Sequence, residues 1–320
     1  MQNSIWLLLV VTAILLWAST NLLYKAGVHD GKEEHICLKY SVCIGIVFFV
    51  IACAFIAMRD EPFTIWESAV RYWPMTIFGP LYAVINTIAF NGYIYNEATV
   101  QSPMEDLSAG WSTLLLIFAY LALGRADSAF ELLTPLRTVG IVVILLSVTR
   151  LAIVRNRISR ESGQSEAWKT RGLGTLVFPL AFSMLDALET IVTGLCLDTT
   201  YGYAMPEGDG VIIIGMTYAL FALGCWVYIY WKEGRPYNPF TRHSAPRILG
   251  ALTDNIGIVC YGYAMAINSI STDPLIAIYP VFAMLGGRVI MKERLGAAQS
   301  ICLLGIVAGS VLVVLGTVIE

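Results

Sequence analysis

Residues 4–27 read SIWLLLVVTAILLWASTNLLYKAG, and the only charged side chain in this stretch is that of Lys25. A helix needs about 20 predominantly apolar residues to cross the hydrocarbon core of a bilayer, so the stretch is long enough to span it. Residues 1–4 lack the positive charge that begins a secretory signal, and the apolar run is longer than the core of such a signal. We therefore expect it to be retained as a first transmembrane helix.

Nine further apolar runs follow along the chain, at 36–58, 74–95, 99–123, 133–151, 173–197, 210–231, 246–267, 273–291 and 298–319. Apolar residues make up 57% of the 320 residues and charged residues only 13%, about half the usual share in soluble domains. This composition excludes a soluble globular domain, and the net charge of -3 gives no indication of nucleic-acid binding. The sequence predicts an all-α membrane protein with ten transmembrane helices.

Weak internal similarity divides these helices into two halves. A shift of 168 positions places Trp111 on Tyr279, and a shift of 170 places Gly92 on Gly262. We expect an N-terminal five-helix repeat at 1–151, a basic connection at 152–172 and a C-terminal five-helix repeat at 173–320. Because each half has an odd number of spans, the two are predicted to be inverted repeats, as in many alternating-access carriers.

Basic residues lie mainly in the connections that follow the first, fifth, seventh and ninth runs, and the stretch from Arg155 to Arg160 is the richest. Cytoplasmic loops carry an excess of Lys and Arg. This places the protein as multi-pass in the cell membrane, with both termini outside the cytoplasm.

Five acidic residues lie inside apolar runs: Glu105, Asp106, Asp186, Glu189 and Asp254. A charged group at the centre of a bilayer costs at least about 2.5 to 3.5 kcal/mol, so such groups usually face a cavity or a partner. Structural ion pairs are the alternative, but the acids outnumber the bases available within the spans. We expect a water-accessible cavity lined by carboxylates.

Helical spacing places polar and aromatic residues on the same faces as these acids. A carboxylate and an aromatic ring face each attract a desolvated cation, so acids beside aromatics favour a cationic ligand. The predicted substrate-binding residues are Trp17, Asn21, Tyr82, Asn86, Tyr93, Glu105, Ser108, Trp111, Asp186, Glu189, Asp254, Tyr261 and Tyr279. Because neighbouring carboxylates favour one another's protonation, Glu105, Asp106 and Glu189 are also candidates for proton coupling.

Lys25 lies four residues after Asn21 on one helix face. We expect it to form a gating ion pair with Glu105 or Glu189. The alternative is that it binds a substrate carboxylate, as in a carrier or exporter of neutral or zwitterionic metabolites such as amino acids.

No enzyme signature is present: the sequence has no serine elbow, no paired-histidine metal motif and no phosphate-binding loop. The seven cysteines lack metal-site spacing, and no cofactor or metal is expected. Gly305 and Gly309 form a small-xxx-small pair that permits close packing within the chain or in a homodimer, so both a monomer and a homodimer stay open.

The run from Leu275 to Met284, LIAIYPVFAM, leads to the sequence MKERLG at 291–296. With the ten predicted spans, this resembles the EamA-like branch of the drug/metabolite transporter superfamily. The first half departs from the pattern, with Ser112 where the repeat would place proline and Arg125 where it would place glutamate. Gly79-Pro80, Glu189 and the stretch 266–268 are also similar to the bacterial choline transporter of that superfamily.

The resemblance implies secondary transport of a small metabolite, with a central cavity between the helices at 4–27, 74–95, 99–123, 173–197, 246–267 and 273–291. We therefore expect a non-enzymatic, alternating-access transporter of a small organic cation such as a quaternary ammonium, a polyamine or another amine metabolite. Proton coupling and facilitated diffusion both stay open, as do import and export. The expected partners are this small molecule and membrane lipid, and not nucleic acid.

Overall fold

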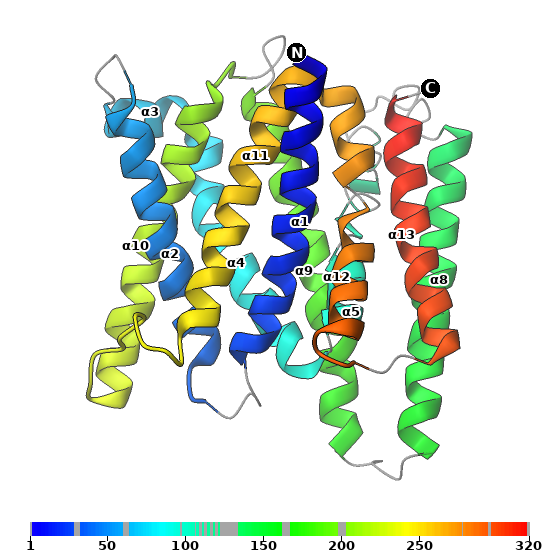
Figure 1. Cartoon of the computed structure of the whole chain (residues 1–320). Coiled ribbons are helices and arrows are strands. Elements are labelled where there is room, and N and C mark those ends of the chain that lie inside the picture. Colours follow the sequence, from blue (N-terminus) through cyan, green and yellow to red (C-terminus); the bar gives the residue numbers. More distant parts are fainter. Residues whose placement is uncertain are drawn as a thin grey trace.

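The computed structural model describes residues 2–28, 33–59, 64–96, 98–105, 134–161, 167–197, 203–276, 278–293 and 296–318, with isolated positions between 107 and 121. Within these residues the protein is all-helical, with no strand. Long helices stand side by side as a bundle, and α1 begins at the same end of it as α13 ends (Figure 1).

The helices are α1 (Gln2–Val28), α2 (Ile36–Ala57), α3 (Ile65–Arg71), α4 (Trp73–Tyr95), α5 (Ala98–Glu105), α8 (Pro135–Glu161), α9 (Ala167–Leu197), α10 (Glu207–Glu233), α11 (Ala245–Ile276), α12 (Tyr279–Val289) and α13 (Ala297–Val318). Pro74, Pro135 and Pro280 lie in the first turns of α4, α8 and α12, where proline's missing N–H removes no helical bond. Each of the ten predicted runs overlaps at least one of these helices.

Five helices of the described residues are long and apolar enough to cross a membrane: Ile5–Val28, Ile36–Ala57, Trp73–Tyr95, Gly208–Glu233 and Ala297–Gly316. Several of them expose large apolar side chains on the outside of the bundle, such as Leu8 on α1, Val50 on α2 and Leu220 on α10. An exposed apolar surface of this extent is stable in lipid rather than in water. The chain is a multi-pass membrane protein.

Most close pairs of long helices join the first part of the chain to the second. Helix α1 packs along α11, α2 along α10, α4 along α9 and α8 along α13. Helix α12 contacts both α1 and α5. Helices α11, α1, α12, α5, α9 and α4 are therefore linked by a continuous series of contacts.

Helix α11 covers two of the runs that the sequence separates, 246–267 and the start of 273–291. The Thr272 hydroxyl donates a hydrogen bond to the Ala264 carbonyl over 3.3 Å. In a straight helix, two residues eight positions apart would be separated by about 12 Å along the axis. Ile276 also packs in one apolar cluster with Ala264 and with Val10 of α1. The chain therefore bends sharply within the segment labelled α11, close to the predicted boundary between the two runs.

Two features of the fold differ from the expected pattern. Helix α8 continues to Glu161 and α9 begins at Ala167, so both extend into the range 152–172 assigned to a connection. Arg and Lys are good helix formers, and a helix continues readily beyond the bilayer into water. The short helix α3 lies in a stretch without a predicted span, and it exposes Ile65 and Trp66.

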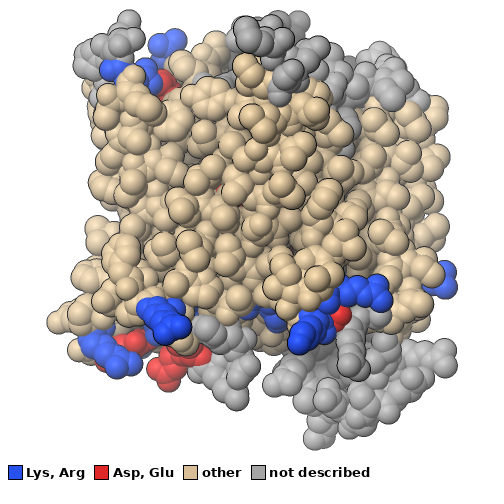
Figure 2. Space-filling view, in the orientation of Figure 1, with Lys and Arg blue, Asp and Glu red and all other residues tan. Residues whose placement is uncertain are grey.

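Charged side chains lie toward the two ends of the bundle on the face drawn in Figure 2. A broad band of uncharged residues occupies the middle, and Lys and Arg side chains gather along the lower edge (Figure 2). This edge corresponds to the end of the bundle where α1 ends and α11 begins in the same orientation (Figure 1). The band is consistent with a lipid-facing surface.

Candidate functional site

Glu105 is the last residue of α5 and lies inside the bundle, with only 6% of its surface exposed. Its Oε1 accepts a hydrogen bond from Nε2 of Gln101, one turn earlier, over 2.9 Å. Its Oε2 lies 3.0 Å from the hydroxyl of Tyr93 on α4. Both carboxylate oxygens are thus held by protein groups, as a buried polar group requires.

Helix α9 contributes two acids, Asp186 and Glu189, separated by about one turn. Asp186 accepts a hydrogen bond from the Ser108 side chain, and Glu189 Oε1 accepts one from the Thr193 hydroxyl over 2.6 Å. Both acids are partly exposed, unlike Glu105. Glu189 and Thr193 are four residues apart, so they lie on the same face of α9.

Asp254 of α11 is bound to α1. Its Oδ2 accepts a hydrogen bond from the Tyr24 hydroxyl over 2.8 Å, and its backbone carbonyl lies 3.4 Å from Nε1 of Trp17. Tyr24 and Trp17 are seven residues apart, so they lie on the same face of α1, toward α11. This contact places Asp254 beside the predicted aromatic residues.

Electrostatic interactions connect four of the five acids that lie inside apolar runs. Asp186 interacts with Glu105, with Glu189 and with Asp254, so it is the common member of the group. The four carboxylates come from α5, α9 and α11, which are separated along the chain. We call Glu105, Asp186, Glu189 and Asp254 the acid cluster.

Three aromatic rings from different helices meet beside this cluster. The ring of Trp17 on α1 lies 5.5 Å from that of Tyr261 on α11 and 5.8 Å from that of Tyr279 on α12, measured between centroids. The planes are tilted by 47° and 64°, so the rings do not stack flat. All three side chains are partly exposed. We call Trp17, Tyr261 and Tyr279 the aromatic group.

Other predicted residues lie in two different settings. Tyr82 and Asn86 lie on α4 near Tyr218 of α10, whose ring centroid is 6.3 Å from that of Tyr82. Asn86 is buried, and its side chain interacts with those of Tyr82 and Tyr218. Trp111 donates from Nε1 to the Ser183 hydroxyl on α9 over 3.1 Å. The Trp111 contact places its ring next to α9, and Tyr82 interacts electrostatically with Asp254, Glu189 and Asp186 of the acid cluster.

Asn21 and Tyr93 are enclosed more fully than expected for residues that contact a substrate. Asn21 is 6% exposed and Tyr93 is 1% exposed, and the Tyr93 hydroxyl lies 2.8 Å from Asn21 Oδ1. In this conformation their polar side-chain atoms form hydrogen bonds with other protein groups. Direct substrate contact by these two residues stays a prediction.

Lys25 directs its ammonium group at the carboxyl end of α4. Its Nζ donates to the backbone carbonyls of Tyr93 and Asn96 over 2.8 and 2.6 Å. A cation is favourable there because the last carbonyls of a helix carry partial negative charge. The predicted gating ion pair of Lys25 with Glu105 or Glu189 stays a prediction. Asp106, the remaining predicted proton-coupling residue, lies outside the described residues.

Several polar residues of the site were not among those predicted, and Gln101 and Ser102 are two of them. Gln101 binds Glu105, and Ser102 accepts a hydrogen bond from Asn21 Nδ2 over 2.7 Å. The spacing of four residues between Gln101 and Glu105 is a signal that could have identified the first. Ser102 has no such signal, because its partner lies 81 positions away.

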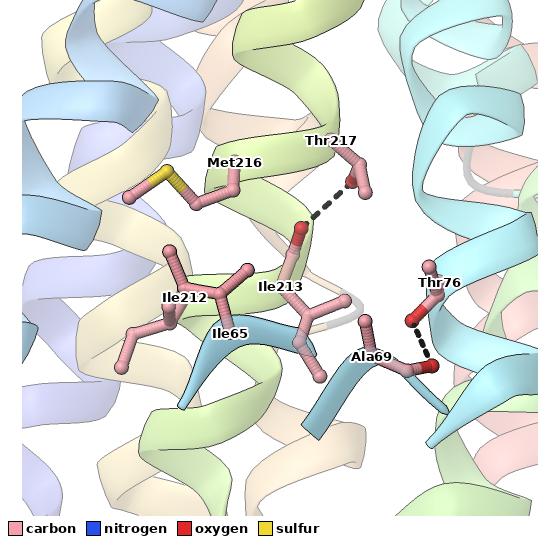
Figure 3. Close-up of a pocket in the computed structure, with 7 residues that line it drawn as sticks. All are labelled: Ile65, Ala69, Thr76, Ile212, Ile213, Met216 and Thr217. Carbon is pink, nitrogen blue, oxygen red and sulfur yellow. Dashed lines mark hydrogen bonds between the residues drawn. The ribbon is translucent and has the colours of Figure 1, made fainter. Parts of the chain in front are cut away.

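A small cavity lies away from the acid cluster, between α3, α4 and α10 (Figure 3). Its lining residues are Ile65, Ala69, Thr76, Ile212, Ile213, Met216 and Thr217. The Thr76 and Thr217 hydroxyls donate to backbone carbonyls, which leaves the walls largely apolar. A volume of about 30 Å³ holds at most a water-sized molecule, so this cavity is not a substrate site.

The donor set does not indicate a metal. Among the described residues, no group of three or more His, Cys, Asp or Glu side chains is arranged to hold a metal ion.

No protein-family model matches the chain, and no curated protein matches it significantly. The chemistry of the acid cluster and the aromatic group is therefore what indicates a function.

Proposed function

We propose that the protein is a secondary transporter of a small organic cation, built from two inverted five-helix repeats that form ten spans. The observation that carries this proposal is the acid cluster beside the aromatic group, in the middle of a membrane-spanning bundle. The resemblance to EamA-like transporters supports the same class of function. No enzymatic role is proposed.

The helix pairs support the inverted repeats. If each of the first five predicted spans is matched to the span five places later, α1 corresponds to α9 and α4 corresponds to α11. The α1–α11 pair is then equivalent to the α4–α9 pair. The same correspondence leaves the α2–α10 and α8–α13 pairs unchanged. This is the pattern of contacts that a two-fold axis between two duplicated halves would produce.

Individual glycine contacts agree with that correspondence. A Cβ added at Gly45 on α2 would lie 2.2 Å from Ala222 Cβ on α10, and one added at Gly215 would lie 2.8 Å from Ala52 Cβ on α2. A shift of 170 positions relates Gly45 to Gly215, and the same shift relates Ala52 to Ala222. The two helices approach each other through equivalent positions in the two halves.

The acid cluster supports a cationic substrate. Three of its members, Asp186, Glu189 and Asp254, are partly exposed in the interior of the bundle. Negative charges held together at low dielectric repel one another, so a bound cation stabilises the cluster as a whole. The negative charge of the cluster repels an anion.

The aromatic group supports a bulky or alkylated cation over a metal ion. A cation over a ring face gains about 0.5 to 2 kcal/mol per contact, the larger values applying where water is excluded. Trp17 contributes the strongest such ring, and its link to the Asp254 carbonyl keeps it beside a carboxylate. A quaternary ammonium, a polyamine or another amine metabolite fits both groups.

Transport by purified protein in liposomes tests the proposal, with radiolabelled choline, putrescine and tetraethylammonium as probes. We expect saturable counterflow of at least one probe, and a loss of about tenfold or more with Asp186→Asn. Glu67→Gln on α3 is the matched control, because Glu67 is an exposed acid far from the cluster in sequence and carries the same change of charge. Transport of amino acids with none of the three cations would instead support the alternative that uses Lys25. No counterflow of any of these solutes would contradict a transport function.

A further inference from the structure

A chain of hydrogen bonds leads from Glu105 to α1. Glu105 Oε2 contacts the Tyr93 hydroxyl at 3.0 Å, and this hydroxyl contacts Asn21 Oδ1 at 2.8 Å. The chain ends at Ser102, whose hydroxyl lies 2.7 Å from Asn21 Nδ2. All four residues are buried. We call this chain the Glu105 relay, and it joins α5, α4 and α1.

The number of hydrogens in the relay restricts its protonation states. A tyrosine hydroxyl carries one hydrogen and can donate only one strong hydrogen bond. If Tyr93 donates to Asn21 Oδ1, its oxygen can only accept from Glu105, so Glu105 must carry a proton. The amide orientation in the structure, with Nδ2 toward Ser102, belongs to this protonated state.

The ionised state of Glu105 requires the opposite direction. Tyr93 then donates to the carboxylate, and Asn21 must present Nδ2 to the Tyr93 oxygen and Oδ1 to the Ser102 hydroxyl. A half-turn of the Asn21 amide achieves this, because its oxygen and nitrogen occupy nearly equivalent positions. Gln101 Nε2 donates to Oε1 in both states. Every buried polar group of the relay thus keeps a partner in either direction.

We propose that Glu105 is the proton-binding residue of the transporter and that Tyr93 and Asn21 transmit its protonation state to α1 by reversing the direction of the relay. The proton passes from the Glu105 carboxyl group to water, giving a carboxylate and a hydronium ion, and no bond of Tyr93 or Asn21 is broken. This inference rests on the proposed transport function. It assigns Tyr93 and Asn21 a coupling role in place of direct substrate contact.

The charges around the relay connect it to substrate binding. Asp186 on α9 and Asp254 on α11 both interact electrostatically with Glu105, so the three carboxylates repel one another when ionised. A cation bound at these acids cancels that effect and favours proton release. Substrate and proton therefore compete, which is the requirement for exchange of one against the other.

Other charged and titratable groups lie on the helices packed against the relay, including Glu189 on α9. Lys25 on α1 donates to the Tyr93 carbonyl, and Tyr279 on α12 interacts with the Tyr93 side chain. Arg288 lies in the last turn of α12, and Glu293 Oε1 accepts from the Ala98 amide at the start of α5. Helix α13, which also packs on α5, has no Asp, Glu, Lys, Arg or His.

Two transport measurements on the same proteoliposomes test the relay, using whichever of choline, putrescine and tetraethylammonium the wild type transports. Counterflow needs no net proton movement, whereas accumulation driven by a pH gradient does. We expect Glu105→Gln to lower the ratio of gradient-driven accumulation to counterflow by about tenfold or more. A ratio at the wild-type level in this variant would overturn the proposal.

Tyr93→Phe provides the second test, and it keeps the ring while removing the hydroxyl of the relay. We expect the pH dependence of counterflow to shift in this variant, because Glu105 loses a hydrogen-bond partner. The control is Tyr95→Phe, two residues along the same helix, where the tyrosine is exposed and stacks on Phe178. An unchanged pH profile in Tyr93→Phe would contradict the relay.

The two proposals fail differently in these experiments. Wild-type counterflow that is insensitive to pH, with no accumulation under a pH gradient, would refute the relay and leave cation transport standing. The absence of wild-type counterflow with every probe would refute the transport function itself.

Discussion

The carboxylate of Glu33 accepts hydrogen bonds from the buried guanidinium of Arg247, which joins the α1–α2 connection to the first turn of α11. Lys39 on α2 binds Glu33 over 3.1 Å and Glu233 at the end of α10 over 2.7 Å. Arg247 Nε also donates to the Gly27 carbonyl at the end of α1 over 3.0 Å. Four helices thus meet in one ion-pair network at this end of the bundle.

Removing the charge of Glu33 should destabilise the protein. In Glu33→Gln the Arg247 and Lys39 charges lose their shared carboxylate, and hydrogen bonds to charged groups contribute about 1.5 to 3 kcal/mol each. We expect a clear fall in the melting temperature in detergent, measured by intrinsic fluorescence. Glu34→Gln changes the adjacent, exposed acid and should leave the melting temperature within about one degree of wild type.

The same carboxylate should make stability sensitive to acid. Burial raises the pKa of Glu33, but the hydrogen bonds and charge of Arg247, followed by those of Lys39, outweigh it and lower the pKa from 4.5 to about 2. A lowered pKa stabilises the fold above the unfolded value and loses this effect as pH falls toward the folded value. The difference in melting temperature between wild type and Glu33→Gln should therefore shrink between pH 4.5 and pH 2. A constant difference across this range would contradict the assignment.

The ring of Trp17 should contribute to affinity for a cation. Replacing it in Trp17→Leu removes a cation–π contact of about 1 to 2 kcal/mol, which corresponds to a rise in KM of about 5- to 30-fold. Uptake kinetics with the transported probe measure this change. Trp66→Leu serves as the control, because Trp66 on α3 is 77% exposed and lies outside the aromatic group. Equal KM values for Trp17→Leu and wild type would exclude Trp17 from the substrate site.

Close packing of α8 on α13 should not tolerate a side chain at Gly140. A Cβ there would lie 2.7 Å from the Gly309 carbonyl oxygen and 2.8 Å from the Val313 amide nitrogen, and backbone atoms cannot easily move aside. We expect Gly140→Ala to lower the melting temperature. Gly224→Ala on α10 is the matched control, with no atom within 4 Å of its added Cβ, and it should be neutral or slightly stabilising.

Cysteine labelling in intact cells should reveal the orientation. The basic end of the bundle is expected in the cytoplasm, so Arg242→Cys should be protected from a membrane-impermeant maleimide. Thr64→Cys, before α3 at the other end, should react. Both variants need a Cys53→Ser background, because Cys53 is exposed. The reverse labelling pattern would overturn the proposed orientation.

Much of the helical layout follows from local chemistry. The runs around α2, α4, α10 and α13 are apolar enough to locate each helix to within a few residues, because a lipid-spanning segment must satisfy its own backbone hydrogen bonds. The sequence predicted one helix over 273–291, whereas α11 ends at Ile276 and α12 begins at Tyr279, with Pro280 in its first turn. The extension of α8 and α9 into the expected connection does not follow from local chemistry, because a polar, basic stretch has no apolar signal to mark it as helical.

The sequence by itself determined that this is a helical membrane protein with acidic residues inside its apolar helices. Composition and hydropathy require this, because the bilayer excludes unpaired backbone groups and makes buried charge costly. Only the tertiary structure decided which groups meet. It placed Asp186 within electrostatic range of the three other acids, directed Lys25 to the carbonyls at the end of α4, and joined Glu105 to Asn21 through Tyr93. Such pairings depend on how helices distant in sequence rotate and pack against one another. Local residue patterns therefore do not predict them.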